Sequence, residues 1–154
     1  MTVSGYTVRL ATADDATAMF DLIVELAAYE RAPHEVINTA AKLKHDGFER
    51  SNPLFKAWVA ESSDGVVVAM AICYVRYSTW KGPVLYLEDI VVREALRGNG
   101  IGKLLMEACV NECRAMGYKR LTWQVLDWNE PAIRFYERWN AEFDAGWLNA
   151  SIDF

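Results

Sequence analysis

A glycine-rich run is the first feature of this 154-residue chain that could do chemistry: Arg97-Gly98-Asn99-Gly100-Ile101-Gly102, followed by Lys103. Glycines carry no side chain that would keep a phosphate away from the backbone. The start of a following helix would add free amides and a partial positive charge. Arg97 and Lys103 would add full charges. The run therefore predicts a cradle for the diphosphate of a nucleotide-type cofactor, and a glycine-rich turn without a ligand is the alternative.

The spacing of these glycines separates the run from two better-known phosphate loops. It reads G-x-G-x-G, whereas a dinucleotide-binding turn reads G-x-G-x-x-G within a strand–helix–strand unit. A P-loop is excluded because Gly102-Lys103 is followed by Leu104, not by Ser or Thr. The sequence thus predicts phosphate binding of a different kind.

The second feature is the acid pair Glu88-Asp89, which interrupts the apolar strand expected over Val84–Arg93. Neighbouring side chains of a strand point to opposite faces, so at least one of the two carboxylates is expected to face a buried layer. A buried carboxylate needs a partner, a raised pKa or a catalytic task. A salt bridge at the strand end is the alternative interpretation.

Tyr136 is the third feature, and its spacing alone is typical of a core aromatic residue. It lies with Phe135 and Trp139 on the aromatic stripe of an amphipathic helix. Cys73, Cys109 and Cys113 form no paired framework, and the two histidines lie far from them in sequence, so we expect small core residues and no metal site.

Elements that would position these residues follow from hydrophobic periodicity and turn residues. Strands are expected over Val3–Arg9, Leu54–Glu61, Val66–Tyr77, Val84–Arg93 and Leu121–Leu126, with one or two more in the tail around Gly146. Helices are expected from the capping box at Thr12 to about Glu30, over Thr39–Phe48, from Gly100 to about Met116, and from Asn129 through Trp139. This order predicts a mixed α/β fold, and the length predicts a single domain over residues 1–154.

Composition narrows the class of partner. A formal charge of −5 and a pI near 5.1 argue against a nucleic-acid partner. No apolar run approaches the ~20 residues of a membrane span, and the N-terminus lacks the pattern of a signal peptide. We therefore expect a cytoplasmic protein.

Several motifs together resemble the GNAT N-acetyltransferases: Tyr86-Leu87-Glu88-Asp89, Arg97–Gly102, Trp128-Asn129-Glu130-Pro131 and Phe135-Tyr136. Tyr77-Ser78-Thr79-Trp80-Lys81-Gly82 and Leu126-Asp127-Trp128-Asn129 are similar to the diamine acetyltransferase branch, including its thialysine N-epsilon-acetyltransferases. The likeness runs from about Val8 to about Trp147. It implies a GNAT fold, in which a mixed, mostly antiparallel twisted sheet is splayed between its central strands and flanked by helices.

The resemblance also implies an activity. The expected reaction moves an acetyl group from acetyl-CoA, as co-substrate, to a primary amine of a small cationic acceptor: a diamine, a polyamine or a lysine- or thialysine-like compound. The amine would attack directly within a ternary complex, and the protein would be a homodimer. Two alternatives remain, namely a protein or peptide amine acetyltransferase and a non-catalytic acyl-CoA-binding module.

The resemblance assigns roles to particular positions of this chain. Glu88 matches the acidic residue of the amine site, and Tyr136 matches the proton donor to the departing thiolate. The implied acetyl-CoA contacts are Ile90, Val91, Val92, Arg97, Gly98, Asn99, Gly100, Ile101, Gly102, Lys103, Asn129, Glu130, Pro131 and Ala132. The implied acceptor contacts are Tyr29, Glu30, Trp80, Glu88, Thr122, Trp123 and Gln124.

The chain departs from the family pattern in two places. Polyamine-type members have Asp-Pro where this chain has Ser78-Thr79, which favours a smaller amine or an amino-acid side chain. Asn140 stands where the family usually has glycine, and we expect it to adopt the left-handed conformation that asparagine tolerates.

Overall fold

The computed structural model describes all 154 residues of the chain, which form two compact units. The first unit is Met1–Trp123 and the second is Gln124–Phe154.

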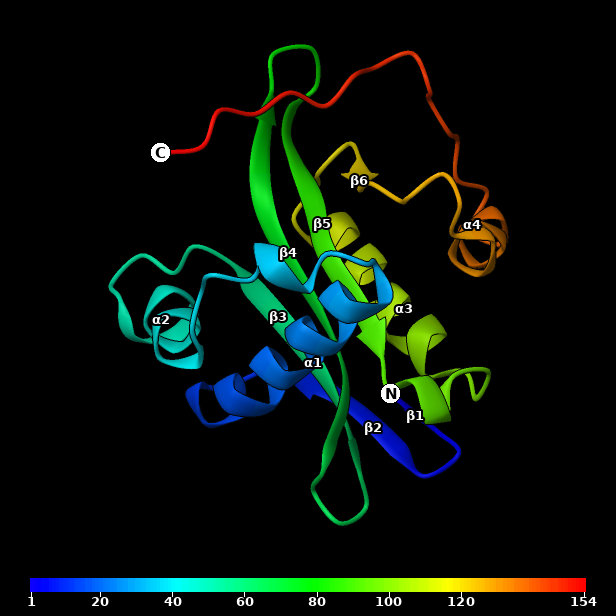
Figure 1. Cartoon of the computed structure of the whole chain (residues 1–154). Coiled ribbons are helices and arrows are strands. Elements are labelled where there is room, and N and C mark those ends of the chain that lie inside the picture. The colour runs from blue at the N-terminus through cyan, green and yellow to red at the C-terminus, as the bar shows by residue number, and fades with distance from the viewer. The chain divides into compact units, whose positions relative to one another are not determined.

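A six-stranded sheet forms the centre of the first unit, in the order β1-β2-β3-β4-β5-β6 (Figure 1). Neighbouring strands are antiparallel except for β5 and β6, which are parallel. The strands are β1 (Thr2–Val3), β2 (Tyr6–Leu10), β3 (Lys56–Ser62), β4 (Val67–Ser78), β5 (Gly82–Val92) and β6 (Leu121–Thr122). The mixed α/β class expected from the sequence is confirmed.

The N-terminal strand differs from the prediction of one continuous strand over Val3–Arg9. Ser4 and Gly5 both have positive φ angles, 48° and 82°, and reverse the chain between β1 and β2. The two short strands then pair with each other, Thr2 opposite Thr7. Alternation of side chains could not reveal this turn, because a serine at positive φ leaves no hydrophobic signature.

Helix α1 (Ala16–Tyr29) begins at the capping box expected from Thr12 and is preceded by a short 3-10 turn, Ala13–Asp15. The Asp15 carboxylate accepts a hydrogen bond from the Thr12 amide at 2.7 Å. The Arg9 guanidinium donates to the same carboxylate at 2.8 Å, so strand β2 is tied to the start of α1.

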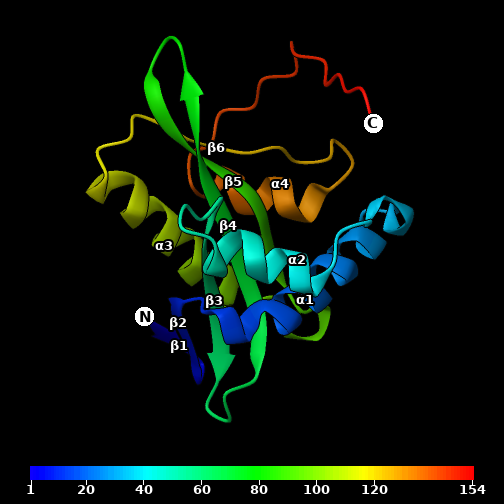
Figure 2. The same cartoon turned by 90° about the vertical axis from the view of Figure 1, so that its left-hand side faces the viewer.

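The remaining helices of this unit are α2 (Ala40–Lys44), continued by a π turn over His45–Glu49, α3 (Ile101–Ala115), and 3-10 turns at Pro33–Glu35 and Glu94–Leu96. Helices α1 and α2 lie on one face of the sheet and α3 lies on the other (Figure 2). No helix has both the length and the apolar character needed to cross a membrane.

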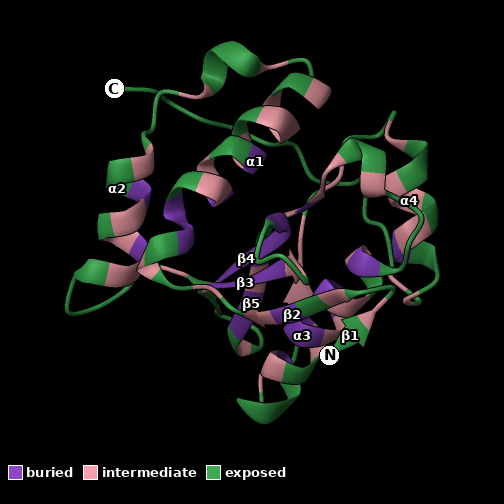
Figure 3. Cartoon of the chain, turned by 90° about the horizontal axis from the view of Figure 1, so that it is seen from below, coloured by how far each residue is buried: buried purple, intermediate pink, exposed green.

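The hydrophobic core lies on both sides of the central strands (Figure 3). Toward α1 and α2 it includes Met19, Leu22, Val59, Met70 and Val91. Ile101, Leu105 and Cys109 of α3 are also fully buried. Strands β3 to β5 are thus covered on both faces, which explains their nearly continuous apolar sequence.

Strand β5 has a partner on both sides over only part of its length. Its pairing with β6 is restricted to Leu85 with Leu121 and Tyr86 with Thr122. Beyond Tyr86, the edge of β5 that faces away from β4 has no partner strand. The predicted strand Leu121–Leu126 is therefore much shorter than expected, and the sheet opens where Glu88 and Asp89 lie.

The second unit contains helix α4 (Glu130–Glu137) and a tail without strands, so the prediction of short strands around Gly146 is wrong. The Asp144 carboxylate accepts hydrogen bonds from the Gly146 amide at 2.8 Å and from the Trp147 indole at 2.9 Å. Such local bonds stabilise a turn at the expense of an extended conformation. Asn140 has the expected left-handed conformation, with φ of 55°.

Candidate functional site

The glycine-rich loop leads from β5 into the first turn of α3. Gly98 and Gly100 both have φ of 81°, a conformation that side chains disfavour, and Gly100 is the N-cap of the helix. A Cβ at Gly98 would meet no atom within 4 Å, so the backbone there faces open space. The first amides of α3 have no partner within the helix, which leaves them available to an anion.

The two cations of the loop are held differently. The Arg97 Nε donates to the Val92 carbonyl at 3.2 Å, and its guanidinium lies over the Tyr29 ring at 4.6 Å. Lys103 makes only a long ion pair with Glu107, at 3.8 Å, one turn along α3. Arg97 is therefore fixed by neighbours, whereas Lys103 stays largely exposed.

Glu88 occupies a β-bulge in β5. Asp89 lies opposite Ile72 and Leu87 lies opposite Cys73, so Glu88 is the extra residue of its strand and has no counterpart in β4. A bulge changes the direction in which side chains point. As a result, Glu88 and Asp89 both line one hollow, instead of pointing to opposite faces as simple alternation would place them.

This hollow has a volume of about 470 Å³ and lies between the sheet and the segments of α1 and α2. It combines an apolar wall with three carboxylates and an amide. The residues that line it are Ile23, Asn38, Leu43, Asp46, Leu54, Phe55, Ile72, Tyr74, Glu88 and Asp89. The size suits a small molecule and the carboxylates suit a cation.

Asp89 is the most perturbed acid of the hollow. Burial, and then the neighbouring carboxylates of Glu88 and Glu30, raise the pKa of Asp89 to about 7. No hydrogen bond or ion pair compensates its charge in the structure, so the site favours a proton, or a cation, at this position. The sequence motifs indicate Asp89 only as part of the acid pair and predict no role for it.

Replacing Asp89 with Asn should flatten the dependence of stability on pH. The unfolded chain releases this proton near pH 3.8, whereas the folded protein holds it until about pH 7, so stability falls as the pH rises through that window. For the wild type we expect a loss of roughly 2–4 kcal/mol in the free energy of unfolding from this one group. Urea unfolding at pH 4.5 and pH 8 measures the change in the free energy of unfolding. If that change is the same in Asp89→Asn as in the wild type, the assignment is wrong.

Two tyrosines beside Glu88 are not predicted as site residues by the sequence. The rings of Tyr74 and Tyr86 lie 5.2 Å apart on adjacent strands. Burial and then the Glu88 carboxylate raise the pKa of Tyr74 to about 12, so its hydroxyl stays protonated and able to donate at neutral pH. Only the pairing of β4 with β5 brings Tyr74 to Glu88, and that register is not visible in the sequence.

The expected acceptor contacts of the first unit are dispersed. Tyr29 ends α1 and Glu30 caps it. Trp80 lies at the tip of the β4–β5 hairpin, is 86% exposed, and does not line the hollow. Thr122 of β6 pairs with Tyr86 of β5, and Trp123 ends the unit. Of the expected acceptor residues, the structure brings only Glu88 into the hollow.

The expected cofactor strand residues, Ile90 to Val92, pair with β4 through Ala71, Met70 and Ala69. Their opposite backbone edge lies in the region of β5 that has no partner strand. An extended ligand arm could therefore hydrogen-bond to this edge as an additional strand would.

The expected residues of the second unit lie at the start and end of α4. Asn129 caps the helix, its side chain accepting from the Ala132 amide at 3.3 Å, and Pro131 occupies the first turn. Glu130 pairs with Arg134 at 3.2 Å. Tyr136 is buried, 6% exposed, with its ring 5.3 Å from that of Phe135. Gln124, at the start of the unit, hydrogen-bonds to Asn149.

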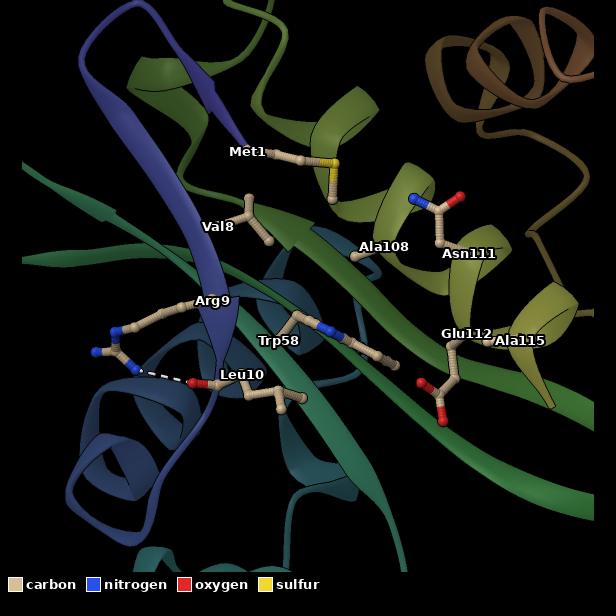
Figure 4. Close-up of a pocket in the computed structure, with 9 residues that line it drawn as sticks. All are labelled: Met1, Val8, Arg9, Leu10, Trp58, Ala108, Asn111, Glu112 and Ala115. Atoms are coloured by element: carbon tan, nitrogen blue, oxygen red, sulfur yellow. Dashed lines mark hydrogen bonds between the residues drawn. The ribbon is translucent and has the colours of Figure 1, made fainter.

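A second hollow, of about 350 Å³, lies on the opposite face of the sheet between β2, β3 and α3 (Figure 4). Its charged groups are engaged within the chain: Arg9 with Asp15 and Glu61, and Glu112 with Lys56 at 2.8 Å. It contains none of the residues singled out by the sequence.

The cysteines are poor nucleophiles. All three are buried and free, and the Sγ atoms of Cys73 and Cys109 lie 3.5 Å apart. The neighbouring Cys109 thiol and burial raise the pKa of Cys73, so this thiol stays protonated and inert. Their burial agrees with the expectation of small core residues.

Comparison with known proteins decides the family. The model of the acetyltransferase (GNAT) family matches residues 17–141, a span that includes the bulge, the glycine-rich loop and α4. The chain belongs to the GNAT acetyltransferase family. This GNAT enzyme is therefore an N-acetyltransferase, and the family uses acetyl-CoA as its co-substrate.

Several curated relatives are similar to this GNAT enzyme over nearly its whole length. A thialysine N-epsilon-acetyltransferase of Caenorhabditis elegans is 32% identical, covering 98% of this chain and 94% of its own. One from Bos taurus is 36% identical over 88% of this chain and 83% of its own. An L-ornithine N5-acetyltransferase of Arabidopsis thaliana is 26% identical over 91% of this chain and 81% of its own.

Solved structures agree on the fold. An aminoglycoside acetyltransferase from a soil metagenomic sample superposes with a TM-score of 0.79 at 19% identity, and 97% of each chain is covered. The GNAT fold inferred from the motifs is thus confirmed.

Proposed function

We propose that this enzyme transfers an acetyl group from acetyl-CoA to a primary amine of a small cationic acceptor: a diamine, a polyamine, or a lysine- or thialysine-like compound. The observation that carries the proposal is the bulge in β5, which makes both Glu88 and Asp89 line one hollow. The same strand continues into the glycine-rich loop. The names of the relatives, which act on thialysine and L-ornithine, favour the same class of amine.

The acceptor must lose a proton before it can react. A primary amine with a pKa near 10.4 is an ammonium ion at neutral pH and has no free electron pair. In our proposal, Glu88 attracts the ammonium and removes its proton, directly or through a water. The amine nitrogen then attacks the thioester carbonyl, and a backbone N–H at the open edge of β5 stabilises the developing oxyanion.

The leaving thiolate needs a proton in turn. A phenol of pKa about 10 is well matched to a thiol of pKa about 8.5, and Tyr136 is the residue to which the family resemblance gives this task. As the carbon–nitrogen bond forms and the carbon–sulfur bond breaks, the attacking nitrogen would release its surplus proton to solvent and Tyr136 would donate its own proton to sulfur. Tyr136 would then regain a proton from solvent. An acyl-cysteine is not part of the proposal, since all three cysteines are buried and burial helps to keep the Cys73 thiol protonated by raising its pKa.

Acetyl-CoA fits the residues that would hold it. Gly98 to Lys103 would receive the diphosphate, and Ile90 to Val92 would bind the pantetheine arm. Asn129 to Ala132 would also contact acetyl-CoA. The open backbone edge and the helix start support this assignment. We further propose that the two units work as a single domain over residues 1–154, since the family match crosses their boundary, and that the protein is a cytoplasmic homodimer.

The size and charge of the hollow favour a short acceptor. Asp46, Glu88 and Asp89 surround about 470 Å³, which suits one small cation better than a folded peptide. Ser78-Thr79, in place of the Asp-Pro of polyamine-type members, removes an acid that a long polycation would use. A diamine or an amino-acid side chain is thus preferred over a long polyamine or a protein amine.

A thiol-release assay with acetyl-CoA tests the proposal. The acceptor panel comprises short diamines, lysine, thialysine, ornithine, spermidine and a lysine-containing peptide. We expect thiol release with short diamines or amino-acid acceptors, and at least tenfold higher kcat/KM for them than for the peptide. Release with the peptide alone would establish the protein-amine alternative, and no release with any amine would overturn the proposed activity.

A further inference from the structure

Helix α1 contacts the segment between β5 and α3 through two residues one helical turn apart. Glu25 and Tyr29 are at i and i+4, so they share one face of the helix. The Glu25 carboxylate accepts from the Glu94 amide at 3.1 Å and pairs with Arg93 at 3.2 Å. Both residues therefore hold the chain that precedes the glycines.

The contact of Tyr29 is with the arginine of the loop itself. The Arg97 guanidinium lies 4.6 Å from the centre of the Tyr29 ring, and its Nε donates to the Val92 carbonyl at 3.2 Å. A tyrosine face attracts a cation without neutralising it. Arg97 thus keeps its full positive charge. Its hydrogen bond to Val92 uses only Nε, so both terminal nitrogens can bind an anion in the bidentate manner typical of arginine.

We propose that Tyr29 is a positioning residue for Arg97, and that Glu25 and Tyr29 together brace the loop in the geometry that receives the diphosphate of acetyl-CoA. This inference rests on the proposed function of the loop. It changes the role of Tyr29, which the family resemblance assigns to the acceptor. Arginine has many rotamers, and an exposed arginine fixed before the ligand arrives loses less freedom on binding.

The brace also gives α1 a part in both halves of the proposed site. Ile23 of the same helix lines the acidic hollow, two residues before Glu25. Neither Glu25 nor Tyr29 lines that hollow. Their loss should therefore weaken the binding of the co-substrate and leave the recognition of the amine intact.

The test compares two replacements of Tyr29 in the full-length enzyme. Tyr29→Leu removes the aromatic face, whereas Tyr29→Phe keeps it. We expect Tyr29→Leu to raise the Kd for CoA and the KM for acetyl-CoA about tenfold, with little change in kcat or in the KM for the amine. Tyr29→Phe should restore affinity for CoA to within about twofold of the wild type. S-acetylpantetheine, which lacks the diphosphate, should be used equally well by all three proteins.

Further variants keep the result interpretable. In an Arg97→Gln background, Tyr29→Leu should have no additional effect on the Kd for CoA, because the pair acts together. If Tyr29→Leu does not fold, as judged by its thermal unfolding, Glu25→Gln tests the brace through its other contacts, with Arg93 and the Glu94 amide, and should increase that Kd about threefold.

Two outcomes would overturn the brace: a raised KM for the amine with unchanged Kd for CoA in Tyr29→Leu, or equal losses in Tyr29→Phe and Tyr29→Leu. A different result is expected if the glycine-rich loop does not bind the diphosphate of acetyl-CoA at all. In that case Arg97→Gln itself would leave the Kd for CoA unchanged, whatever happens at Tyr29.

Discussion

Glu88→Gln is expected to lower kcat/KM for the amine by about 10²–10³-fold at neutral pH, with the KM for acetyl-CoA unchanged. Gln has nearly the same shape as Glu, but it can neither accept the proton of the ammonium nor attract its charge. The extra position of the bulge in β5 has no counterpart in β4, so the change should leave the sheet intact.

The effect of Glu88→Gln should depend on pH. Solvent removes the proton from a growing share of the amine as the pH approaches its pKa near 10.4. The deficit of Glu88→Gln should therefore shrink between pH 7 and pH 9.5. Asp64→Asn, in the exposed turn between β3 and β4, is the matched control for loss of one carboxylate. A deficit that stays constant with pH, or one shared by the control, would remove Glu88 from the proton transfer.

Tyr136→Phe is expected to lower kcat by about 100-fold or more and to leave the affinity for CoA little changed. Only the hydroxyl is lost, so the packing of the ring against Phe135 should persist. The reason is the leaving group: without a donor, sulfur departs as a thiolate and the carbon–sulfur bond is harder to break.

A change of leaving group distinguishes a proton donor from a packing residue. An acetyl thioester of an acidic aromatic thiol, whose thiolate needs no proton, should reduce the deficit of Tyr136→Phe. Tyr118→Phe removes a hydroxyl from a residue without a role in the proposed reaction and serves as the control. Unchanged kcat in Tyr136→Phe would exclude Tyr136 as the donor.

Much of the fold follows from local sequence signals. The capping box at Thr12, the glycine-rich loop before α3 and the Asn129 cap of α4 were all visible as residue types at fixed spacing, and each lies where those signals place it. The family follows from the same motifs, because their combination is specific even though each is weak alone.

Features that depend on pairing between distant segments were not visible. The bulge at Glu88 requires the register of β4 against β5, and the alternation rule therefore misplaced one carboxylate of the pair. The contact of Tyr29 with Arg97 joins residues of two separate elements. The tail lacks its expected strands because Asp144 satisfies nearby donors locally, and neither hydrophobicity nor β-propensity reports such bonds.

Acetyl transfer from acetyl-CoA to a small primary amine can be measured by the stoichiometry of its two products. The enzyme is incubated with acetyl-CoA and the best acceptor of the panel, free thiol is counted, and the amine product is identified by mass spectrometry. We predict one N-acetylated amine for each thiol released. Thiol release without acetylated amine, or with the acetyl group found on the enzyme instead, would contradict the account.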